Sequence, residues 1–225
     1  MKKKKGKKLK IKNFLIFLGC LAILGLLVYK IINMKIKNIY IKGNNLLTDQ
    51  EIIELAGISD YPKLFNITSI SMENKIKMNK LIEEAHVRKN IFGRIDIDIK
   101  EYNILLKNEV NNTVYLSNYK VSKIDDQVSG IPYLINVVDD EILIPFLKKL
   151  NLVDKKILGK ISEIEYKPNE YDKELFVFYM NDGNYVYINT SRLTNINKYE
   201  DVLEQLDGKK GILYLDSGNH FKILE

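Results

Sequence analysis

The first 32 residues of the chain restrict its architecture more than any other segment. Lysines crowd the first twelve positions, and an uncharged apolar run follows from Asn13 to Tyr29. A helix continued to Ile32 would be about 25 to 30 Å long, enough to cross the hydrocarbon core of a bilayer. A cleavable signal peptide has a shorter apolar region and small residues at its cleavage site, which Tyr29 and Lys30 do not provide. The sequence therefore predicts an uncleaved transmembrane helix over residues 13–32.

The basic tail, residues 1–12, predicts the orientation of this helix. Positive residues beside a span stay in the cytoplasm, so everything after residue 33 is expected outside the membrane. Next to a bilayer, lysines bind anionic lipid headgroups at about 1 kcal/mol each; a solvated charge patch and a nucleic-acid arm are the alternatives. The eight lysines of the tail contribute +8 to the net charge of +6, so the rest of the chain has a net charge of 6 − 8 = −2. The basic balance of the chain therefore does not indicate a nucleic-acid partner. The lysines expected at the membrane surface are Lys2, Lys3, Lys4, Lys5, Lys7, Lys8, Lys10 and Lys12.

The residues outside the predicted span offer little catalytic chemistry. The single cysteine, Cys20, lies within the span, so the exported part cannot use disulfides. The two histidines, His86 and His220, stand beside no nucleophile motif, and the sequence holds no HExxH, GxSxG or phosphate-binding glycine loop. The acidic run 139–141 is predicted to be the first turn of a helix rather than a metal site. We expect no enzyme activity, no catalytic residue, no cofactor and no metal.

The segment after the span begins with signals for a strand followed by a helix. Ile36, Ile39 and Ile41 indicate a strand that ends at the Gly-Asn-Asn turn 43–45. Thr48 and Glu51 have the spacing of a capping box, which opens a helix. Gly57 stands where a helix of this length is expected to end.

A second helix and two strands are predicted to complete this segment. The helix is expected over residues 71–82, with a possible break at Asn79, and a strand is expected to begin at His86. Isoleucine alternates with charged residues over 94–100, the pattern of a half-buried strand with aspartates on its wet face. Residues 33–102 therefore read as β-α-α-β-β.

This order, directly after a membrane span, resembles a POTRA domain, and the whole chain resembles the FtsQ/DivIB family of bacterial cell division proteins. The resemblance is carried by the segments 39–44, 48–52 and 64–67, and by Ala85, Val87 and Arg88 with the alternating strand that follows them. The family usually has a proline four residues after this arginine, where this chain has Phe92-Gly93.

Residues 103–225 resemble the β domain of the same family. A helix is expected over 140–150, where Pro145 is tolerable only in the first turn. Asp182-Gly183 between two β-rich runs predicts a hairpin, and Ile196, Tyr199, Leu203 and Leu206 recur on one face of a predicted helix. The predicted fold class is α+β, with a mainly antiparallel sheet in this domain. Residues 114–121 resemble the short hairpin of the family, and residues 130–134 resemble its Leu/Ile-Pro element. Strands are expected at 161–164, 175–180, 185–188, 211–216 and 221–224.

The family resemblance implies a non-enzymatic scaffold at the division septum. Its C-terminal edge would receive the single-pass division proteins FtsL and DivIC (FtsB), and it would help to position or regulate the septal peptidoglycan synthase. Segment 211–215 is uncharged and β-prone, so it needs a partner if it lies at a sheet edge; the alternative is an interior strand that serves the core. The residues carried over by position as partner-binding candidates are Gly211, Ile212, Tyr214, Leu215 and Phe221.

Two other functions remain open at this level. A POTRA-containing secretion or assembly factor would also bind proteins, although it would normally show repeated POTRA units or a barrel. A membrane-anchored cell-wall enzyme would need a nucleophile or metal motif such as GxSxG or HExxH, and the sequence contains neither of these two.

Overall fold

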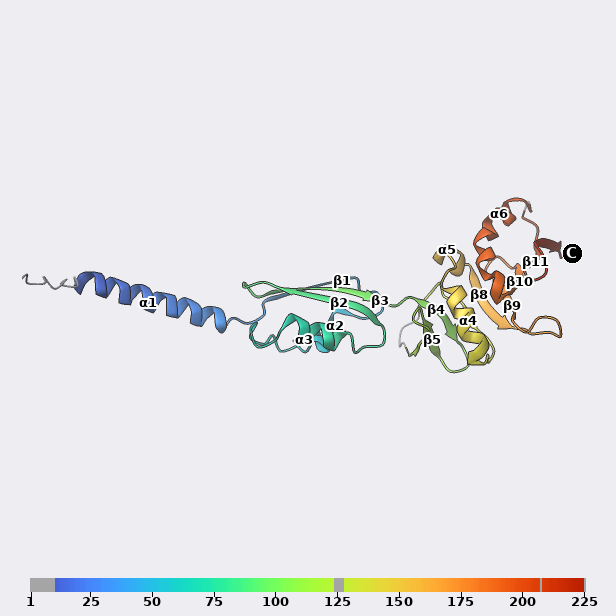
Figure 1. Cartoon of the computed structure of the whole chain (residues 1–225). Coiled ribbons are helices and arrows are strands. Elements are labelled where there is room, and N and C mark those ends of the chain that lie inside the picture. The colour runs from blue at the N-terminus through green and yellow to red at the C-terminus, as the bar shows by residue number, and fades with distance from the viewer. Residues whose placement is uncertain (1–10, 124–127, 207, 225) are drawn as a thin grey trace, which may run out of the picture. The chain divides into compact units, whose positions relative to one another are not determined.

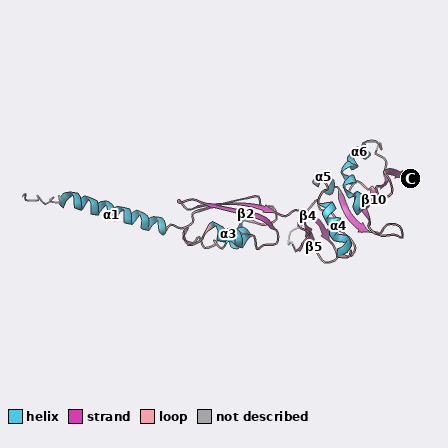
Figure 2. Ribbon diagram, in the orientation of Figure 1, coloured by secondary structure: helices cyan, strands magenta, loops and turns pink. Residues whose placement is uncertain are grey.

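The structure is a computed structural model that describes residues 11–123, 128–206 and 208–224. Helix α1 (Ile11–Ile32) is long and apolar enough to cross a membrane, and none of its side chains is buried. The chain divides into two compact units, residues 1–101 and 102–225 (Figure 1). Each unit combines helices with a sheet (Figure 2), which confirms the predicted α+β class.

The folded part of the first unit is a three-stranded sheet covered by two helices. Strand β3 (Arg94–Glu101) is central, between β1 (Asn38–Lys42), which is parallel to it, and β2 (Ile82–Lys89), which is antiparallel. Helices α2 (Asp49–Ala56) and α3 (Ser69–Ile76) lie together on one face of this sheet (Figure 1). The buried isoleucines of β3 alternate with partly or fully exposed charged residues, as its sequence predicts.

Local signals set the ends of the two helices. The backbone N–H of Thr48 donates to a Glu51 carboxylate oxygen at 2.7 Å, and the Thr48 hydroxyl accepts from the Glu51 N–H at 3.3 Å, which confirms the capping box. Gly57 ends α2 in the left-handed region, with φ of 72°. The expectation that the second helix extends to residues 81 and 82 is wrong. The Asn79 side chain accepts from the Leu81 N–H at 2.9 Å in a turn, and Ile82 already belongs to β2.

The second unit is built on a nine-stranded sheet. Its strands follow the order β12-β11-β10-β9-β8-β7-β4-β5-β6, so β12 and β6 form the two edges. Most pairs are antiparallel, but β7 is parallel to both of its neighbours and β10 is parallel to β11. The strands are β4 (Ile104–Asn108), β5 (Thr113–Leu116), β6 (Val121–Ser122), β7 (Tyr133–Leu134), β8 (Ile161–Tyr166), β9 (Leu175–Met180), β10 (Tyr185–Asn189), β11 (Gly211–Tyr214) and β12 (His220–Ile223).

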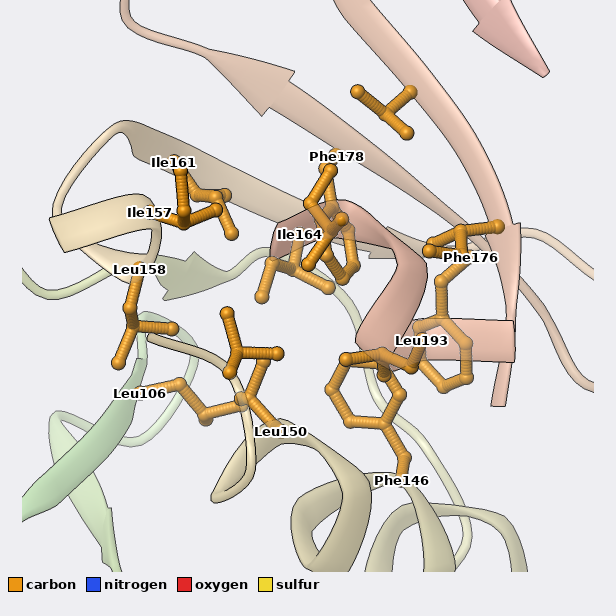
Figure 3. Close-up of a cluster of buried hydrophobic side chains, with 14 of the residues drawn as sticks. Leu106, Phe146, Leu150, Ile157, Leu158, Ile161, Ile164, Phe176, Phe178 and Leu193 are labelled. Atoms are coloured by element: carbon orange, nitrogen blue, oxygen red, sulfur yellow. The ribbon is translucent and has the colours of Figure 1, made fainter. Parts of the chain in front are cut away.

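Helix α4 (Asp140–Leu150) packs an apolar face on this sheet. The Phe146 ring stacks on Phe176 with 3.9 Å between ring centroids and meets Phe178 edge-on at 6.1 Å (Figure 3). The helix has the predicted bounds, but Pro145 lies in its second turn and not in the first. Its missing N–H leaves one helical hydrogen bond unmade, and the burial of aromatic surface around Phe146 offsets this loss.

The segment predicted as one helix near residues 196–206 is two elements. A 3-10 helix, η1 (Thr190–Lys198), runs into the α-helix α6 (Tyr199–Glu204). Elsewhere in this unit, a single-turn helix, α5 (Lys155–Leu158), precedes β8. The buried side chains Leu193, Ile196 and Tyr199 recur every three residues, which suits three residues per turn. The Ser, Thr and Asn residues of η1 compete with the backbone for hydrogen bonds and disfavour a longer α-helix.

Candidate docking edge

The possible catalytic groups of the described residues are dispersed. No group of three or more His, Cys, Asp or Glu side chains in the described part of the chain is placed to hold a metal ion. His86 lies exposed on β2, with its Nε2 3.6 Å from a Glu84 carboxylate oxygen, and His220 lies on β12. The acidic run 139–141 occupies the N-cap and first turn of α4, as predicted. The site with the most distinctive geometry is instead a sheet edge.

Strand β12 forms an edge of the nine-stranded sheet, and β11 lies inside it, between β10 and β12. In an antiparallel pair, residues alternate between those that exchange hydrogen bonds with the neighbour and those whose backbone groups face away. The Leu224 N–H donates to Lys210 O at 3.0 Å, which fixes this alternation. His220 and Lys222 therefore bond toward β11, while the backbone groups of Phe221 and Ile223 face outward. We call the outward side of β12 the C-terminal edge.

Gly211 allows β12 to lie close to β11. A Cβ atom added at Gly211 would come 2.1 Å from Lys222 O and 2.6 Å from the Phe221 ring. These distances are far below van der Waals contact, so any side chain at position 211 would force the two strands apart. The Phe221 ring thus covers the space that a side chain would occupy.

A buried hydrogen-bond network holds the start of β11 in place. The Gly211 N–H donates to Asn184 Oδ1 at 2.9 Å, and the Asn184 amide donates to the Tyr199 hydroxyl at 3.0 Å. The Tyr199 hydroxyl in turn donates to an Asp182 carboxylate oxygen at 2.9 Å. Burial is the largest cause that raises the pKa of Tyr199, and its bond to the Asp182 carboxylate acts in the same direction. The Tyr199 hydroxyl therefore stays protonated, and the network fixes β11 against the β9–β10 turn.

Aromatic side chains line one face of the sheet beside the C-terminal edge. Tyr214 stacks on Tyr187 with 5.2 Å between ring centroids and on His220 with 4.7 Å, so one stack crosses β10, β11 and β12. Nearby, Tyr179 meets Tyr185 edge-on at 5.4 Å. The Tyr179 hydroxyl donates to Glu165 at 2.6 Å, and this bond, with burial, raises the pKa of Tyr179 to about 12.

The opposite face beside β12 is hollowed into a groove of about 320 Å³. Residues of η1 and α6 form one wall, and the inward side chains of β11 and β12 form the other. Apolar residues line much of it, and Asn219 and His220 also contribute to the lining. The groove residues used below are Val202, Leu206, Leu213, Leu215 and Phe221.

The structure places the five predicted partner-binding residues close together but in different environments. Gly211 and Leu215 are buried, whereas Ile212 and Tyr214 are half-buried on the aromatic face. Phe221 alone of the five belongs to the edge strand. Of the two alternatives for segment 211–215, the structure shows the interior strand, because the hairpin 217–219 folds β12 over the side of β11 that an added strand would need.

Sequence reasoning missed the groups that complete this site. Ile223 carries one of the outward backbone groups, the His220 ring extends the aromatic stack, and Asn184 with Tyr199 fixes β11 from a distance in sequence. The short Ser217-Gly218-Asn219 turn showed that a further strand follows β11, but nothing in the sequence shows which of the two strands ends the sheet.

Strand β2, one of the two edge strands of the first unit, is arranged differently. The Asn90 N–H donates to Arg94 O at 3.0 Å, and the resulting alternation points the Val87 N–H outward from β2. There the Glu73 carboxylate of α3 accepts it at 2.8 Å. Strand β2 also carries two glutamates, an arginine and a lysine among its eight residues. Charge and a side-chain acceptor therefore protect this edge.

The lysines predicted at the membrane surface are mostly beyond the described residues. Lys2, Lys3, Lys4, Lys5, Lys7, Lys8 and Lys10 lie outside the described ranges, while Lys12 is exposed in the first turn of α1.

Residues 34–102 match the family model described as "POTRA domain, FtsQ-type". The chain is also similar to proteins named "Cell division protein DivIB". That of Bacillus subtilis is 29% identical over 84% of this chain and 74% of the relative. That of Listeria monocytogenes is 26% identical over 99% of this chain and 85% of the relative. A solved structure of the major extracytoplasmic domain of DivIB from Geobacillus stearothermophilus is 24% identical, with a TM-score of 0.41, over 48% of this chain and 96% of that one.

Proposed function

Because the chain belongs to the FtsQ/DivIB family of bacterial cell division proteins, we propose that it acts as a scaffold of the division septum. In this role it binds partners and catalyses no reaction. The partners are the small single-pass division proteins FtsL and DivIC (FtsB), and through them the chain positions or regulates the septal peptidoglycan synthase. The observation that carries the proposal is the C-terminal edge, whose outward backbone groups suit an added strand.

The two faces beside this edge supply side-chain specificity. A strand added to β12 would direct alternate side chains to opposite faces of the sheet. One set would meet the stack of Tyr214 and His220, and the other would meet the groove lined by Val202, Leu206 and Phe221. Backbone hydrogen bonds would give affinity, and the two faces would select the partner.

A proline substitution separates backbone docking from side-chain contact. Ile223→Pro removes an outward N–H from an exposed residue and leaves the bonds between β11 and β12 intact. We expect about a tenfold loss of affinity for the FtsL and DivIC pair, because a lost hydrogen bond and a misplaced strand together cost about 1.5 kcal/mol. Affinity is measured by titration of the detergent-solubilised full-length chain with the co-purified pair.

Ile223→Ala is the matched control, because it keeps the N–H and removes only the side chain. It should lose less affinity than the proline variant, and both should keep the thermal unfolding transition of the native chain. Native affinity in Ile223→Pro would exclude strand addition at β12.

The proposed topology places the tail of residues 1–12 in the cytoplasm, and the folded part of the first unit and the whole second unit outside the membrane, at the septum. Support comes from the apolar α1 and the lysines before it. In a Cys20→Ser background, an impermeant thiol reagent should label Tyr171→Cys on intact cells and leave Lys3→Cys unlabelled, since Tyr171 is 96% exposed. The reverse labelling pattern would contradict the topology.

A further inference from the structure

The end of the first unit that adjoins α1 is tied directly to the chain leaving the helix. The Leu64 N–H donates to Met34 O at 2.8 Å, and the Lys37 N–H donates to Gly93 O at 2.8 Å. Met34 is two residues beyond the end of α1, and Lys37 is five. A chain of five residues reaches at most about 18 Å. The loop around Lys63 and the β2–β3 turn therefore lie within a short distance of the helix end.

The β2–β3 turn presents two large apolar side chains to solvent. Ile91 is 58% exposed and Phe92 is 71% exposed. The Asn90 side chain accepts from the Phe92 N–H at 2.9 Å and from the Arg94 N–H at 3.1 Å, and Gly93 completes the turn with φ of 92°. A tight turn in water normally carries polar residues. Here the polar groups of the turn are used internally, and the apolar side chains point outward.

Basic side chains surround these two residues. Lys35 and Lys37 are exposed on the segment that follows α1, and Lys63 is exposed on the neighbouring loop, where its ammonium donates to Asn33 Oδ1 at 2.6 Å. Asp60 is the acidic side chain of that loop, and Asp96 is paired with Arg94. The surface formed by Lys35, Lys37, Lys63, Ile91 and Phe92, which we call the helix-proximal surface, is therefore apolar at its tip and basic around it.

We propose that the helix-proximal surface docks on the headgroup region of the bilayer that α1 crosses. The occupant is anionic lipid, because the surface adjoins the helix exit and its charge is opposite to that of such headgroups. Aromatic and aliphatic side chains enter the interface while the lysines remain at headgroup level. The first unit is then held at a fixed tilt by two attachments, the helix and the turn. This inference needs α1 in the membrane, but it is independent of the docking partners and of the side on which the unit lies.

Single tryptophans test the contact, because the chain contains no native tryptophan. The full-length chain carrying Phe92→Trp is reconstituted into vesicles of phosphatidylglycerol mixed with phosphatidylcholine. We expect its emission to shift to shorter wavelength and to be quenched by lipids brominated on their acyl chains. Ile91→Trp, at the neighbouring position, should behave in the same way.

Met78→Trp is the matched control at the other end of the same unit. Met78 is 82% exposed and lies just before β2, whose first residue pairs with the last residue of β3. The eight residues of β3 separate it from the turn by about 25 Å. Its emission should remain that of a water-exposed tryptophan, without quenching. Equal emission and equal lack of quenching in all three variants would overturn the proposal.

The charge contribution is measured with the lysines replaced. Each single replacement of a lysine should lower the ratio of docked to undocked molecules about fivefold in vesicles that contain phosphatidylglycerol. The three replacements are Lys35→Gln, Lys37→Gln and Lys63→Gln. In vesicles of pure phosphatidylcholine, the three variants should dock to the same extent as the chain with its native lysines. A photo-crosslinker at Phe92 that captures a protein in cells, together with no quenching in vesicles, would assign the surface to a protein partner and refute lipid docking.

Discussion

The edge strands β2 and β12 face the same physical problem and solve it in opposite ways. Both leave outward N–H groups, at Val87 and at Phe221 and Ile223. In β2 a carboxylate from α3 accepts the Val87 N–H at 2.8 Å, and four of eight side chains are charged. In β12 Lys222 is the formally charged side chain, and Ile223 is 47% exposed. An edge protected by charge resists strand addition, whereas an apolar edge is open to it, so of these two edges β12 is the one that suits the strand addition proposed above.

The largest expected effect comes from separating β12 from β11. Gly211→Ala places a methyl group 2.1 Å from Lys222 O, so the strands must move apart. We expect a destabilisation of about 2–3 kcal/mol in the second unit and loss of partner binding. Faster amide exchange of β11 and β12, with unchanged exchange in β2 and β3, would show that the effect is confined to this edge.

Gly218→Ala provides the control for this substitution. Its added Cβ would meet the His220 ring nitrogen at an ordinary 3.6 Å, so exchange and binding should be unchanged. Native exchange in Gly211→Ala would mean that β12 does not pack as closely as described.

A smaller effect is expected when the protected edge is opened. Glu73→Ala removes the acceptor of the Val87 N–H and should destabilise the first unit by about 1–2 kcal/mol. Asn74→Ala, on the exposed side of the same helix, should change little. Denaturant unfolding of the full chain, followed by amide exchange in β2, measures the difference. If Glu73→Ala also gave the first unit affinity for DivIC, the Glu73 carboxylate alone, and not the charged side chains of β2, would protect this edge from strand addition.

The smallest effect is an alkaline loosening of the C-terminal edge. The folded-state pKa of Tyr199 is raised by burial, so its stabilisation is complete below the unfolded value of about 10 and is lost as pH rises above it. Tyr179 contributes with the same sign. Tyr199→Phe should therefore reduce the fall in unfolding free energy above about pH 10 without abolishing it. An identical pH dependence in the variant would exclude Tyr199 as a cause.

Features set by neighbouring residues could be predicted from the sequence. The Thr48 capping box, the alternation in β3, the bounds of α4 and the Asp182-Gly183 hairpin all depend on contacts within a few positions. The order of these elements supported the family resemblance, which no single motif showed.

Features set by distant contacts could not be predicted. The order of the nine strands decides that β11 is interior, and it depends on pairing between segments far apart in the chain. Pro145 remained inside α4 because Phe146 packs on Phe176, thirty residues away. The Glu73 acceptor and the Asn184 network likewise depend on tertiary geometry that local periodicity does not encode.

The shortest interior strand of the second unit has a mechanical consequence. Strand β7 contributes two residues to the sheet and joins β4, the first strand of the unit, to β8 and the strands leading to β12. If the chain is tethered in a membrane at one end and bound at β12 as proposed above, tension between the two points crosses this seam. Two residue pairs on each side resist shear less than the five on either flank of β9. Under load, the sheet would part at β7 first, and strands β8 to β12 would move away from β4 while the covalent chain still joined them to the membrane helix.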